Sequence, residues 1–466
     1  MKMFIKNLRN HFKNEIMKEK IFRAYDIRGV FGKDFTAKDI EKIGKGFGTF
    51  LGKNKKVVVG RDGRLSSKEI RDSFISGIIS TGCNVIDIGL VPTPILYFAT
   101  IHLKADAGVM ITASHNPPEW NGLKFVRGDG QFIFGEEMEK IKDIVLNEEF
   151  EETKEKGKVE LYENIFNDYS EFVLSKVKIK RKLKIVLDTS NSVCSLFAPK
   201  ILEKAGCEVK VINEKLDGRF PAHLPEPTKE NLKELSKKVL EENADLGAGF
   251  DGDGDRVVFV DEKGRIISDG NPIIILFSDQ ILKKQKNVKI VFDICCSDIV
   301  KEFIEKNGGI PIITRVGHVF IKDKLMKEKA VFGGEYSNHF YFSETFYFDD
   351  AIFACLKMAE ILSDNKKFSE MIDSIPKYFT KYNWNFECPD EKKFKVIEKL
   401  KKRLEEKNLN ILDLDGVKAI FKDGWIVWRA SNTQPQIKVY VEAKTKERFD
   451  ELCKIAENEL LNVWGE

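Results

Sequence analysis

The sequence predicts an α/β protein built from three related α/β domains, followed by a smaller α+β domain. At 466 residues the chain is too long for one hydrophobic core. A strand–turn–helix–strand pattern occurs three times, and the chain after about residue 374 follows a different pattern. We therefore expect four domains, at residues 1–152, 153–257, 258–373 and 374–466.

Each of the three repeated units begins with a short apolar run, continues with a helical pattern and enters a second apolar run through a glycine. Glycine after a helical pattern is typical of a helix end, and short β-rich runs on both sides of a helix are typical of α/β units. The units cover residues 57–89, 185–212 and 290–313.

The last domain is expected to hold separate helices and an antiparallel sheet. Helices are predicted over residues 391–407 and 446–460, and strands around a hairpin turn at Asp423–Gly424. The charged stretch 148–156 is expected to link the first two domains as solvated surface. Residues 1–12 alternate charged and apolar side chains, and they are expected to pack on the first domain as a helix or an arm.

The composition excludes several classes of protein. The chain has 77 basic and 74 acidic residues, a net charge of +3, so charge gives no argument for a nucleic-acid or membrane partner. Its eight cysteines contain no Cys-x-x-Cys pair, and its six histidines lack the helical spacing of metal ligands. No apolar run approaches the roughly 20 residues of a membrane span. We expect a cytoplasmic monomer or homodimer with no nucleic-acid or membrane partner.

The motif around which the others are interpreted covers residues 111–125 and centres on Ser114. It follows an apolar run typical of a buried strand, and two consecutive prolines stiffen its turn. His115 and Lys124 supply groups that carry charge or a proton. The pair Asn121–Gly122 is predicted to form a tight reversal that returns Lys124 to the same end of the sheet. The turn can therefore aim the Ser114 hydroxyl, although an ordinary surface serine is the alternative interpretation.

A second motif places Asp251, Asp253, Asp255 and Arg256 on one loop between two apolar runs. Crowded carboxylates have raised pKa values unless a cation lies among them, and oxygen ligands favour Mg²⁺ beside a phosphoryl group. The glycines of residues 247–252 formally match a dinucleotide fingerprint, but that motif must open a helix. A calcium loop would need glycine at position 256. Both are excluded, and a polar turn is the remaining alternative.

Two further motifs carry groups suited to a sugar phosphate. Residues 333–339 begin with two glycines, and Glu335, Ser337 and His339 alternate so that they can lie on one side. Residues 429–435 offer a guanidinium fork, hydroxyls and an amide as an anion cradle. The candidates there are Arg429, Ser431, Asn432 and Thr433. The alternatives are a solvated loop and a polar hairpin loop.

The four motifs, in the order in which they follow one another along the chain, resemble those of the α-D-phosphohexomutases, the phosphomannomutase and phosphoglucomutase group. The resemblance runs from Phe22 onward and includes the strings 22–29 and 314–322, the second of which holds His318. It implies that the loops of four domains meet in a central cleft. It also implies Mg²⁺ held by phosphorylated Ser114 and the three aspartates, and glucose or mannose 1,6-bisphosphate as activator. The substrate-binding residues that it implies are Arg256, His318, Glu335, Ser337, His339, Arg429, Ser431, Asn432 and Thr433.

The implied activity is the reversible conversion of hexose 1-phosphate and hexose 6-phosphate through a phosphoserine enzyme and a 1,6-bisphosphate. Lys124, Arg23 and His115 are candidates for stabilising the phosphate and moving a proton, with Lys124 ranked first. Cys295 stands where a substrate-contacting lysine is common, and Asn338 where glycine is usual. The alternatives are a phosphoglucosamine mutase and a sugar-phosphate binding protein without catalysis.

Overall fold

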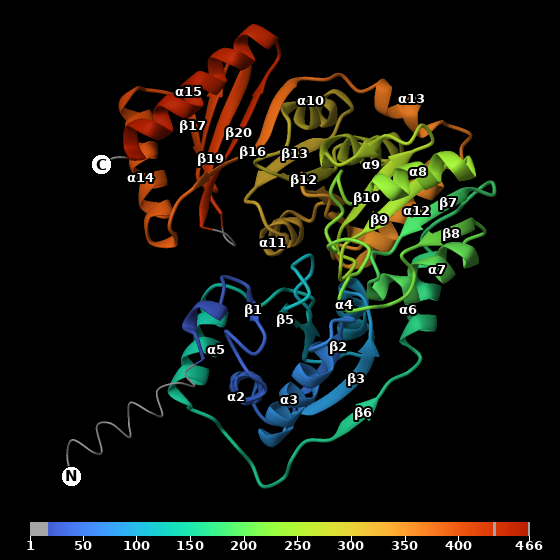
Figure 1. Cartoon of the computed structure of the whole chain (residues 1–466), viewed down its shortest axis with the longest axis vertical. Helices are drawn as coiled ribbons and strands as arrows, with labels where there is room; N and C mark the ends of the chain where they lie inside the picture. Colours follow the sequence, from blue (N-terminus) through green and yellow to red (C-terminus); the bar gives the residue numbers. More distant parts are fainter. Residues whose placement is uncertain (1–16, 432–434, 465–466) are drawn as a thin grey trace.

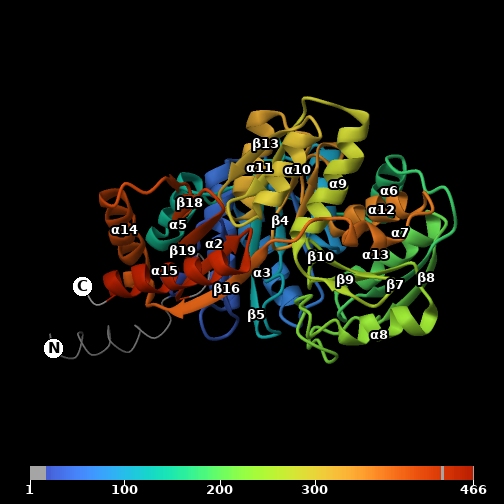
Figure 2. The same ribbon diagram turned by 90° about the horizontal axis from the view of Figure 1, so that it is seen from above.

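The structure is a computed structural model that describes residues 17–431 and 435–464. Four β-sheets follow one another along the chain and are arranged around the centre of the molecule (Figure 1). The helices α14 and α15 of the last sheet lie at one end of the molecule, and α7 and α8 of the second sheet lie at the other (Figures 1 and 2). The predicted fold class is confirmed. The prediction for residues 1–12 lies outside the described residues.

The first sheet has six strands in the order β1-β5-β4-β2-β3-β6. Residues Lys56–Arg61 and Asn84–Leu90 of the first repeated unit pair in parallel across one helix, as expected. The elements are β1 (Asp26–Val30), α2 (Ala37–Leu51), β2 (Lys56–Arg61), α3 (Ser67–Ser80), β3 (Asn84–Leu90), α4 (Thr93–His102), β4 (Ala107–Ile111), β5 (Trp120–Arg127), α5 (Glu136–Asn147) and β6 (Val159–Leu161).

The tight reversal predicted at Asn121–Gly122 was wrong, because both residues lie inside β5. β5 runs antiparallel to β4 and to β1, and the chain reverses earlier, between Ile111 and Trp120. Gly122 is required there by packing, since a Cβ at this position would lie 2.0 Å from the carbonyl oxygen of Ile27. The pair therefore marks a close approach of two strands.

The second and third sheets contain the other two repeated units, and each unit again pairs in parallel. The second sheet has the order β11-β10-β9-β7-β8 and the third β13-β12-β14-β15. Their elements are α6 (Ile165–Leu174), β7 (Lys184–Asp188), α7 (Ala198–Lys204), β8 (Glu208–Ile212), α8 (Lys233–Glu242), β9 (Leu246–Phe250), β10 (Val257–Asp261), β11 (Ile266–Ile267), α9 (Gly270–Lys284), β12 (Lys289–Asp293), α10 (Asp298–Lys306), β13 (Ile310–Thr314), α11 (His318–Glu328), β14 (Phe332–Gly334), β15 (Phe340–Phe342), α12 (Ala351–Leu362) and α13 (Phe368–Asp373).

The fourth sheet is antiparallel, in the order β16-β20-β19-β18-β17, and α14 and α15 pack on one of its faces. Its elements are β16 (Phe379–Glu387), α14 (Asp390–Glu406), β17 (Ile411–Asp413), β18 (Val417–Phe421), β19 (Gly424–Ala430), β20 (Gln436–Ala443) and α15 (Lys446–Trp464). The two predicted helices and the hairpin at Asp423 are confirmed.

The domain boundaries at residues 152, 257 and 373 remain a prediction, although β6 belongs to the first sheet and β10 to the second. Within the described ranges, no helix combines the length and the apolar character that crossing a membrane would need.

Candidate active site

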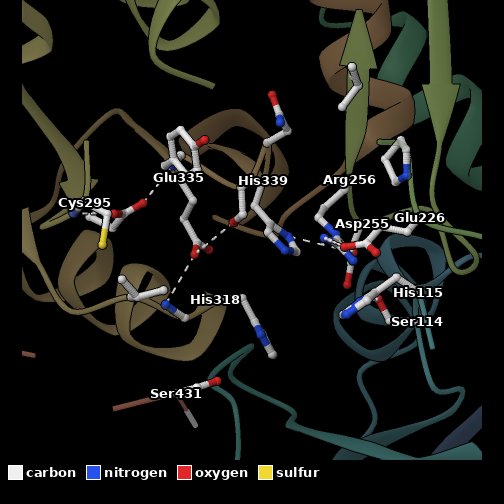
Figure 3. Close-up of a pocket in the computed structure, with 18 of the residues that line it drawn as sticks. Ser114, His115, Glu226, Asp255, Arg256, Cys295, His318, Glu335, His339 and Ser431 are labelled. Atoms are coloured by element: carbon white, nitrogen blue, oxygen red, sulfur yellow. Dashed lines mark hydrogen bonds and ion pairs between the residues drawn. The ribbon is translucent and has the colours of Figure 1, made fainter. Parts of the chain in front are cut away.

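A cavity of about 460 Å³ lies where the four domains meet. Figure 3 shows Ser114 and His115 on one side of it, near Asp255 and Arg256, and Glu335 and Cys295 on the other. Every predicted motif that the structure describes contributes to this cavity. The predicted residues in its lining are Ser114, His115, Lys124, Asp255, Arg256, His318, Glu335, Ser337, His339, Arg429 and Ser431.

Ser114 is held on a strained turn between β4 and β5. Its φ angle of 50° lies in the left-handed region, which is uncommon for residues other than glycine and asparagine. Its backbone N–H donates to the Thr112 hydroxyl at 2.9 Å. Its own hydroxyl donates to Asp251 Oδ2 at 2.9 Å, and lies 3.3 Å from the Nδ1 of His115.

Arg64 fixes the backbone of this turn, and the sequence analysis did not find it. Its guanidinium is fully buried and donates to the carbonyl oxygens of Ser114 and Asn116, both at 2.7 Å. It also reaches the carbonyls of Pro117, at 2.6 Å, and Trp120, at 3.1 Å. Asp62 pairs with its Nε at 3.1 Å. One side chain therefore holds most of the loop that presents Ser114.

The three aspartates lie on the loop between β9 and β10, as predicted, and all are buried. One carboxylate oxygen from each lies within 4.8 Å of the others. Lys124 donates to Asp253 at 2.8 Å and to Asp255 at 2.6 Å. Asp251 accepts the backbone N–H of residue 254 at 2.9 Å. The loop comes so close to Ser114 that a Cβ at Gly252 would lie 2.4 Å from the Ser114 carbonyl oxygen.

The donor set of this loop fits a hard divalent cation. Asp253 Oδ1 and Asp255 Oδ1 are buried and accept no hydrogen bond from any residue in the described part of the chain. Burial, together with the neighbouring Asp255 and Asp253, raises the pKa of Asp251 well above its usual value. A cation among the three carboxylates would remove this repulsion and use the free oxygens. On this loop and the Ser114 turn, the residues that could hold a metal are therefore Asp251, Asp253, Asp255 and Ser114.

Of the three predicted proton-carrying or cationic groups, Lys124 and His115 line the cavity together with Ser114, and Arg23 does not. Burial lowers the pKa of Lys124, but Asp253 and Asp255 outweigh it and hold this pKa well above its usual value. Arg23 is not in the cavity lining, whereas Arg28 is. Arg28 donates to the Asn116 side chain at 2.9 Å. Arg28 lies in β1 two residues after the cavity-lining Asp26 and so shares its strand face, whereas Arg23 lies before the strand begins.

The predicted sugar-reading groups lie together in the third domain. Burial raises the pKa of Glu335 to about 7, and its carboxylate accepts from the Tyr341 hydroxyl. Burial lowers the pKa of His318 to about 4, and its ring packs edge-on against Tyr25 at a centroid distance of 5.0 Å. Asn338 has a φ of 70°, in the left-handed region that asparagine adopts more readily than most residues other than glycine.

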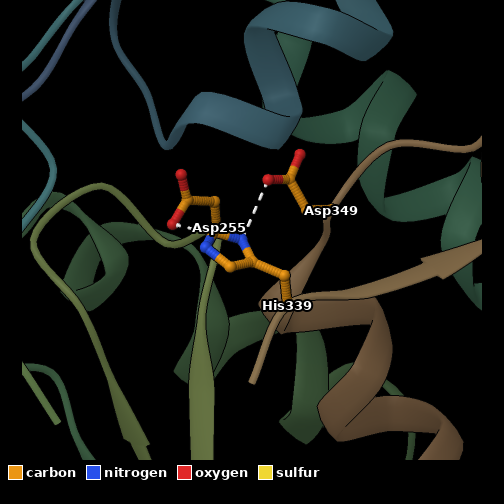
Figure 4. A group of neighbouring side chains, drawn as sticks. All are labelled: Asp255, His339 and Asp349. Carbon is orange, nitrogen blue, oxygen red and sulfur yellow. Dashed lines mark ion pairs between the residues drawn. The ribbon is translucent and has the colours of Figure 1, made fainter. Parts of the chain in front are cut away.

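His339 lies between two carboxylates (Figure 4). Its Nδ1 is 3.0 Å from Asp349 and 3.8 Å from Asp255. Burial lowers the pKa of His339, but Asp255 and Glu335 outweigh it and raise this pKa to about 9. The surrounding carboxylates therefore favour the protonated form of the imidazole. It links the sugar-reading loop to the aspartate loop, and Asp349 was not found from the sequence.

The last domain contributes cations to the cavity. Arg429 donates from Nε to Asp415 at 2.9 Å, and Ser431 follows it in the lining. Asn432 and Thr433 lie outside the described residues. Cys295 lies in the cavity wall, and Lys438 contributes a positive charge to the same cavity.

Comparison with known proteins agrees with this geometry. The four family descriptions "Phosphoglucomutase/phosphomannomutase" match in order: domain I at residues 19–152, domain II at 166–264, domain III at 269–379 and the C-terminal domain at 384–458. The chain belongs to the phosphoglucomutase/phosphomannomutase family.

Its relatives in this family match over nearly their full length. The phosphomannomutase/phosphoglucomutase of Pseudomonas aeruginosa is 37% identical over 448 residues, covering 95% of this chain and 96% of that protein. The phosphomannomutase of Methanocaldococcus jannaschii is 38% identical over 443 residues, covering 93% and 96%. A crystal structure of a phosphoglucomutase/phosphomannomutase family protein from Burkholderia thailandensis superimposes with a TM-score of 0.89 at 30% identity, covering 96% of this chain and 98% of that one.

Proposed function

We propose that this member of the phosphoglucomutase/phosphomannomutase family interconverts hexose 1-phosphate and hexose 6-phosphate, with mannose or glucose as the sugar. The reaction passes through phospho-Ser114 and a hexose 1,6-bisphosphate. We also propose that the protein is cytoplasmic and that it is a monomer or a homodimer, as expected from the sequence. Its relative from Pseudomonas aeruginosa is named a phosphomannomutase/phosphoglucomutase and that from Methanocaldococcus jannaschii a phosphomannomutase, and these names support mannose or glucose as the sugar.

The observation that carries this proposal is the hydrogen bond from Ser114 to Asp251. The hydroxyl of one domain donates to the carboxylate cluster of the next at 2.9 Å, and Ser114 and Asp255 of this pair of loops line the cavity. An ordinary surface serine would be exposed, but Ser114 is 4% exposed. A fixed hydroxyl beside a cation site suits phosphoryl transfer, because positioning and charge neutralisation supply most of the catalysis of that reaction.

Mg²⁺ is the cation that we propose for Asp251, Asp253 and Asp255. When bound, it neutralises negative charge on the phosphoryl group that is being transferred. The rest of the catalysis comes from the positions of the protein's own side chains.

In the forward transfer, the bond between phosphorus and Ser114 Oγ breaks while a sugar hydroxyl oxygen bonds to phosphorus. Lys124 keeps its proton between two carboxylates, so we assign it to stabilising charge. The transfer also moves one proton, from the attacking sugar hydroxyl to the departing serine oxygen. Burial lowers the pKa of His115 well below its usual value, and its Nδ1 lies 3.3 Å from Ser114 Oγ, so we assign it to relaying this proton: it gives one to the serine oxygen and takes up the one that the sugar hydroxyl loses. Arg28 holds the loop from the other side through Asn116.

The sugar lies between this centre and the last domain. Glu335, Ser337 and His318 line the cavity and offer acceptors and donors to the hydroxyls of the sugar. Arg429 and Ser431 lie where they can hold the phosphate that is not being transferred. The 1,6-bisphosphate then turns over within the cleft, and either phosphate can face Ser114.

A coupled assay tests the proposal with mannose, glucose and glucosamine 1-phosphates, each with a trace of the matching 1,6-bisphosphate and with Mg²⁺. Mannose and glucose should be converted faster than glucosamine, and Ser114→Ala should convert none of them. Equal or glucosamine-dominated rates would favour the phosphoglucosamine mutase alternative. Binding without conversion of any sugar would favour a non-catalytic protein.

A further inference from the structure

The loop that carries the three aspartates is held by a residue of the first domain that none of the predicted motifs contains. Thr93 is the first residue of α4, and the helix is buried from Thr93 to Thr100. Pro92 before it and Pro94 after it fix two backbone φ angles at the start of the helix. Thr93 is fully buried, as is Asp253 of the aspartate loop. The start of α4 is therefore a fixed support for this loop.

Thr93 contacts Asp253 at two points. Its backbone N–H donates to the Asp253 carbonyl oxygen at 2.8 Å. Its hydroxyl donates to the Oδ2 of the same residue at 2.5 Å. The first bond places the backbone of the loop, and the second acts on the carboxylate alone. A change that removes only the hydroxyl therefore leaves the attachment of the loop backbone in place.

The Thr93 hydroxyl contributes to the choice of the Asp253 oxygen that is left for a cation. Oδ2 also accepts from Lys124 at 2.8 Å, so both of its lone pairs are used. Oδ1 is buried and accepts no hydrogen bond from any residue of the ranges 17–431 and 435–464. An unpaired buried carboxylate oxygen is unfavourable, and a cation would satisfy it. The two donors on Oδ2 therefore leave Oδ1 as the oxygen for the cation.

Asp251 and Asp253 are fixed in different ways. The Oδ1 of Asp251 accepts backbone N–H groups of its own loop, at residues 254–256, over 2.9, 3.2 and 3.3 Å. In the described part of the chain, Asp253 accepts both of its side-chain hydrogen bonds from the first domain. Lys124 is assigned to stabilising charge during the transfer. When it turns toward the phosphoryl group, the Thr93 hydroxyl is the contact that remains on Oδ2.

We propose that Thr93 is a positioning residue for the cation, whose hydroxyl orients the Asp253 carboxylate and so raises the affinity of the site for Mg²⁺. This inference rests on the proposed function, and it adds to that function a residue of the first domain that acts on the metal through Asp253. A hydrogen bond that already orients a ligand reduces the side-chain freedom that metal binding would otherwise remove. Because Ser114 belongs to the same domain as Thr93, one domain supplies both the phosphorylated hydroxyl and a support for its cation.

The test compares variants of the full-length protein. Thr93→Val removes the hydroxyl and keeps the branched shape, Thr93→Ala removes it with less bulk, and Thr93→Ser keeps it. Thr100→Val is the matched control, because Thr100 is a fully buried threonine of the same helix whose hydroxyl donates to the Leu96 carbonyl oxygen at 2.9 Å. Isothermal titration calorimetry measures the binding of Mg²⁺ to each protein, and a coupled assay measures KM for glucose 1-phosphate at saturating Mg²⁺.

We expect Thr93→Val and Thr93→Ala to bind Mg²⁺ about 10- to 100-fold more weakly, the usual effect of removing a hydrogen bond that orients a metal ligand. Thr93→Ser should retain most of the affinity, and Thr100→Val should bind Mg²⁺ like the wild type. At concentrations of Mg²⁺ that saturate each protein, KM for glucose 1-phosphate should not change, because Thr93 is not in the cavity lining.

Unchanged affinity for Mg²⁺ in Thr93→Val and Thr93→Ala would overturn the inference and leave the proposed function standing. A loss that is as large in Thr93→Ser or in Thr100→Val would also overturn it, because the packing of α4 would then be responsible. Failure of both hydroxyl-free variants to fold would do the same, since the hydroxyl would then be structural. A wild type that binds no Mg²⁺ would instead overturn the metal site of the proposed function.

Discussion

Replacing Gly252 by alanine should separate the two loops that meet at the catalytic centre. The new Cβ would lie 2.4 Å from the Ser114 carbonyl oxygen, and contacts of real Cβ atoms below 3.0 Å essentially do not occur, so the loops must move by at least 0.6 Å. That oxygen cannot simply turn away, because it accepts a 2.7 Å hydrogen bond from buried Arg64. The φ of Gly252 is not in the left-handed region, so the effect is one of contact and not of backbone strain.

Overpacking of this kind destabilises a fold by about 1–3 kcal/mol. A misplacement near 1 Å between reacting groups lowers a rate by roughly 100-fold. We therefore expect Gly252→Ala to lose about 1–3 kcal/mol of unfolding free energy in urea. We also expect it to take up the phosphoryl group of glucose 1,6-bisphosphate roughly 10- to 100-fold more slowly in single-turnover mass spectrometry.

Gly63→Ala is the matched control, because its added methyl group would meet only the flexible end of the Leu216 side chain. It should remain close to the wild type in both measurements. A Gly252→Ala protein that is as stable as the wild type and is phosphorylated at the wild-type rate would refute the reasoning, since the two loops would then not be in contact.

Three other perturbations test separate parts of the account. Arg64→Met should lower the free energy of unfolding, measured by urea denaturation, by about 3–5 kcal/mol, because the Asp62 carboxylate is left buried without its partner. A loss below about 1 kcal/mol would contradict this prediction. Glu335→Gln should gain stability relative to the wild type as pH rises from about 4.5 to 7, by roughly 3 kcal/mol in total. In this range the Glu335 carboxyl, whose pKa in the folded protein is about 7, ionises more readily in the unfolded chain, and this favours unfolding of the wild type. A stability difference that is independent of pH would count against this prediction. Asp253→Asn should remove most of the rise in melting temperature that Mg²⁺ gives the wild type, whereas an undiminished rise would place the metal elsewhere.

The sequence predicted the repeated units well because each is a local pattern. Apolar runs such as 57–60 and 290–293 lie in central strands, and the glycine at each helix end marks where the chain re-enters the sheet. The motifs around Ser114 and Asp251 were found for the same reason, since their polar residues are neighbours in the chain.

Contacts between distant segments could not be predicted in this way. Arg64 lies 50 residues before Ser114, and only the folded turn brings its guanidinium to that carbonyl. Asp349 reaches His339 through the bridge between Tyr341 and Asp349, which a local pattern does not show. Asn121–Gly122 was misjudged because two flanking strands, β1 and β4, draw it into the sheet and override its preference for a turn.

The central claim is that Ser114 carries the phosphoryl group beside the three aspartates. It is tested most directly by incubating the protein with glucose 1,6-bisphosphate and Mg²⁺ and then mapping the phosphorylated peptide by mass spectrometry. The account predicts one phosphoryl group, located on Ser114 and absent from Ser114→Ala. Phosphorylation at another residue, or none in a correctly folded protein, would contradict it.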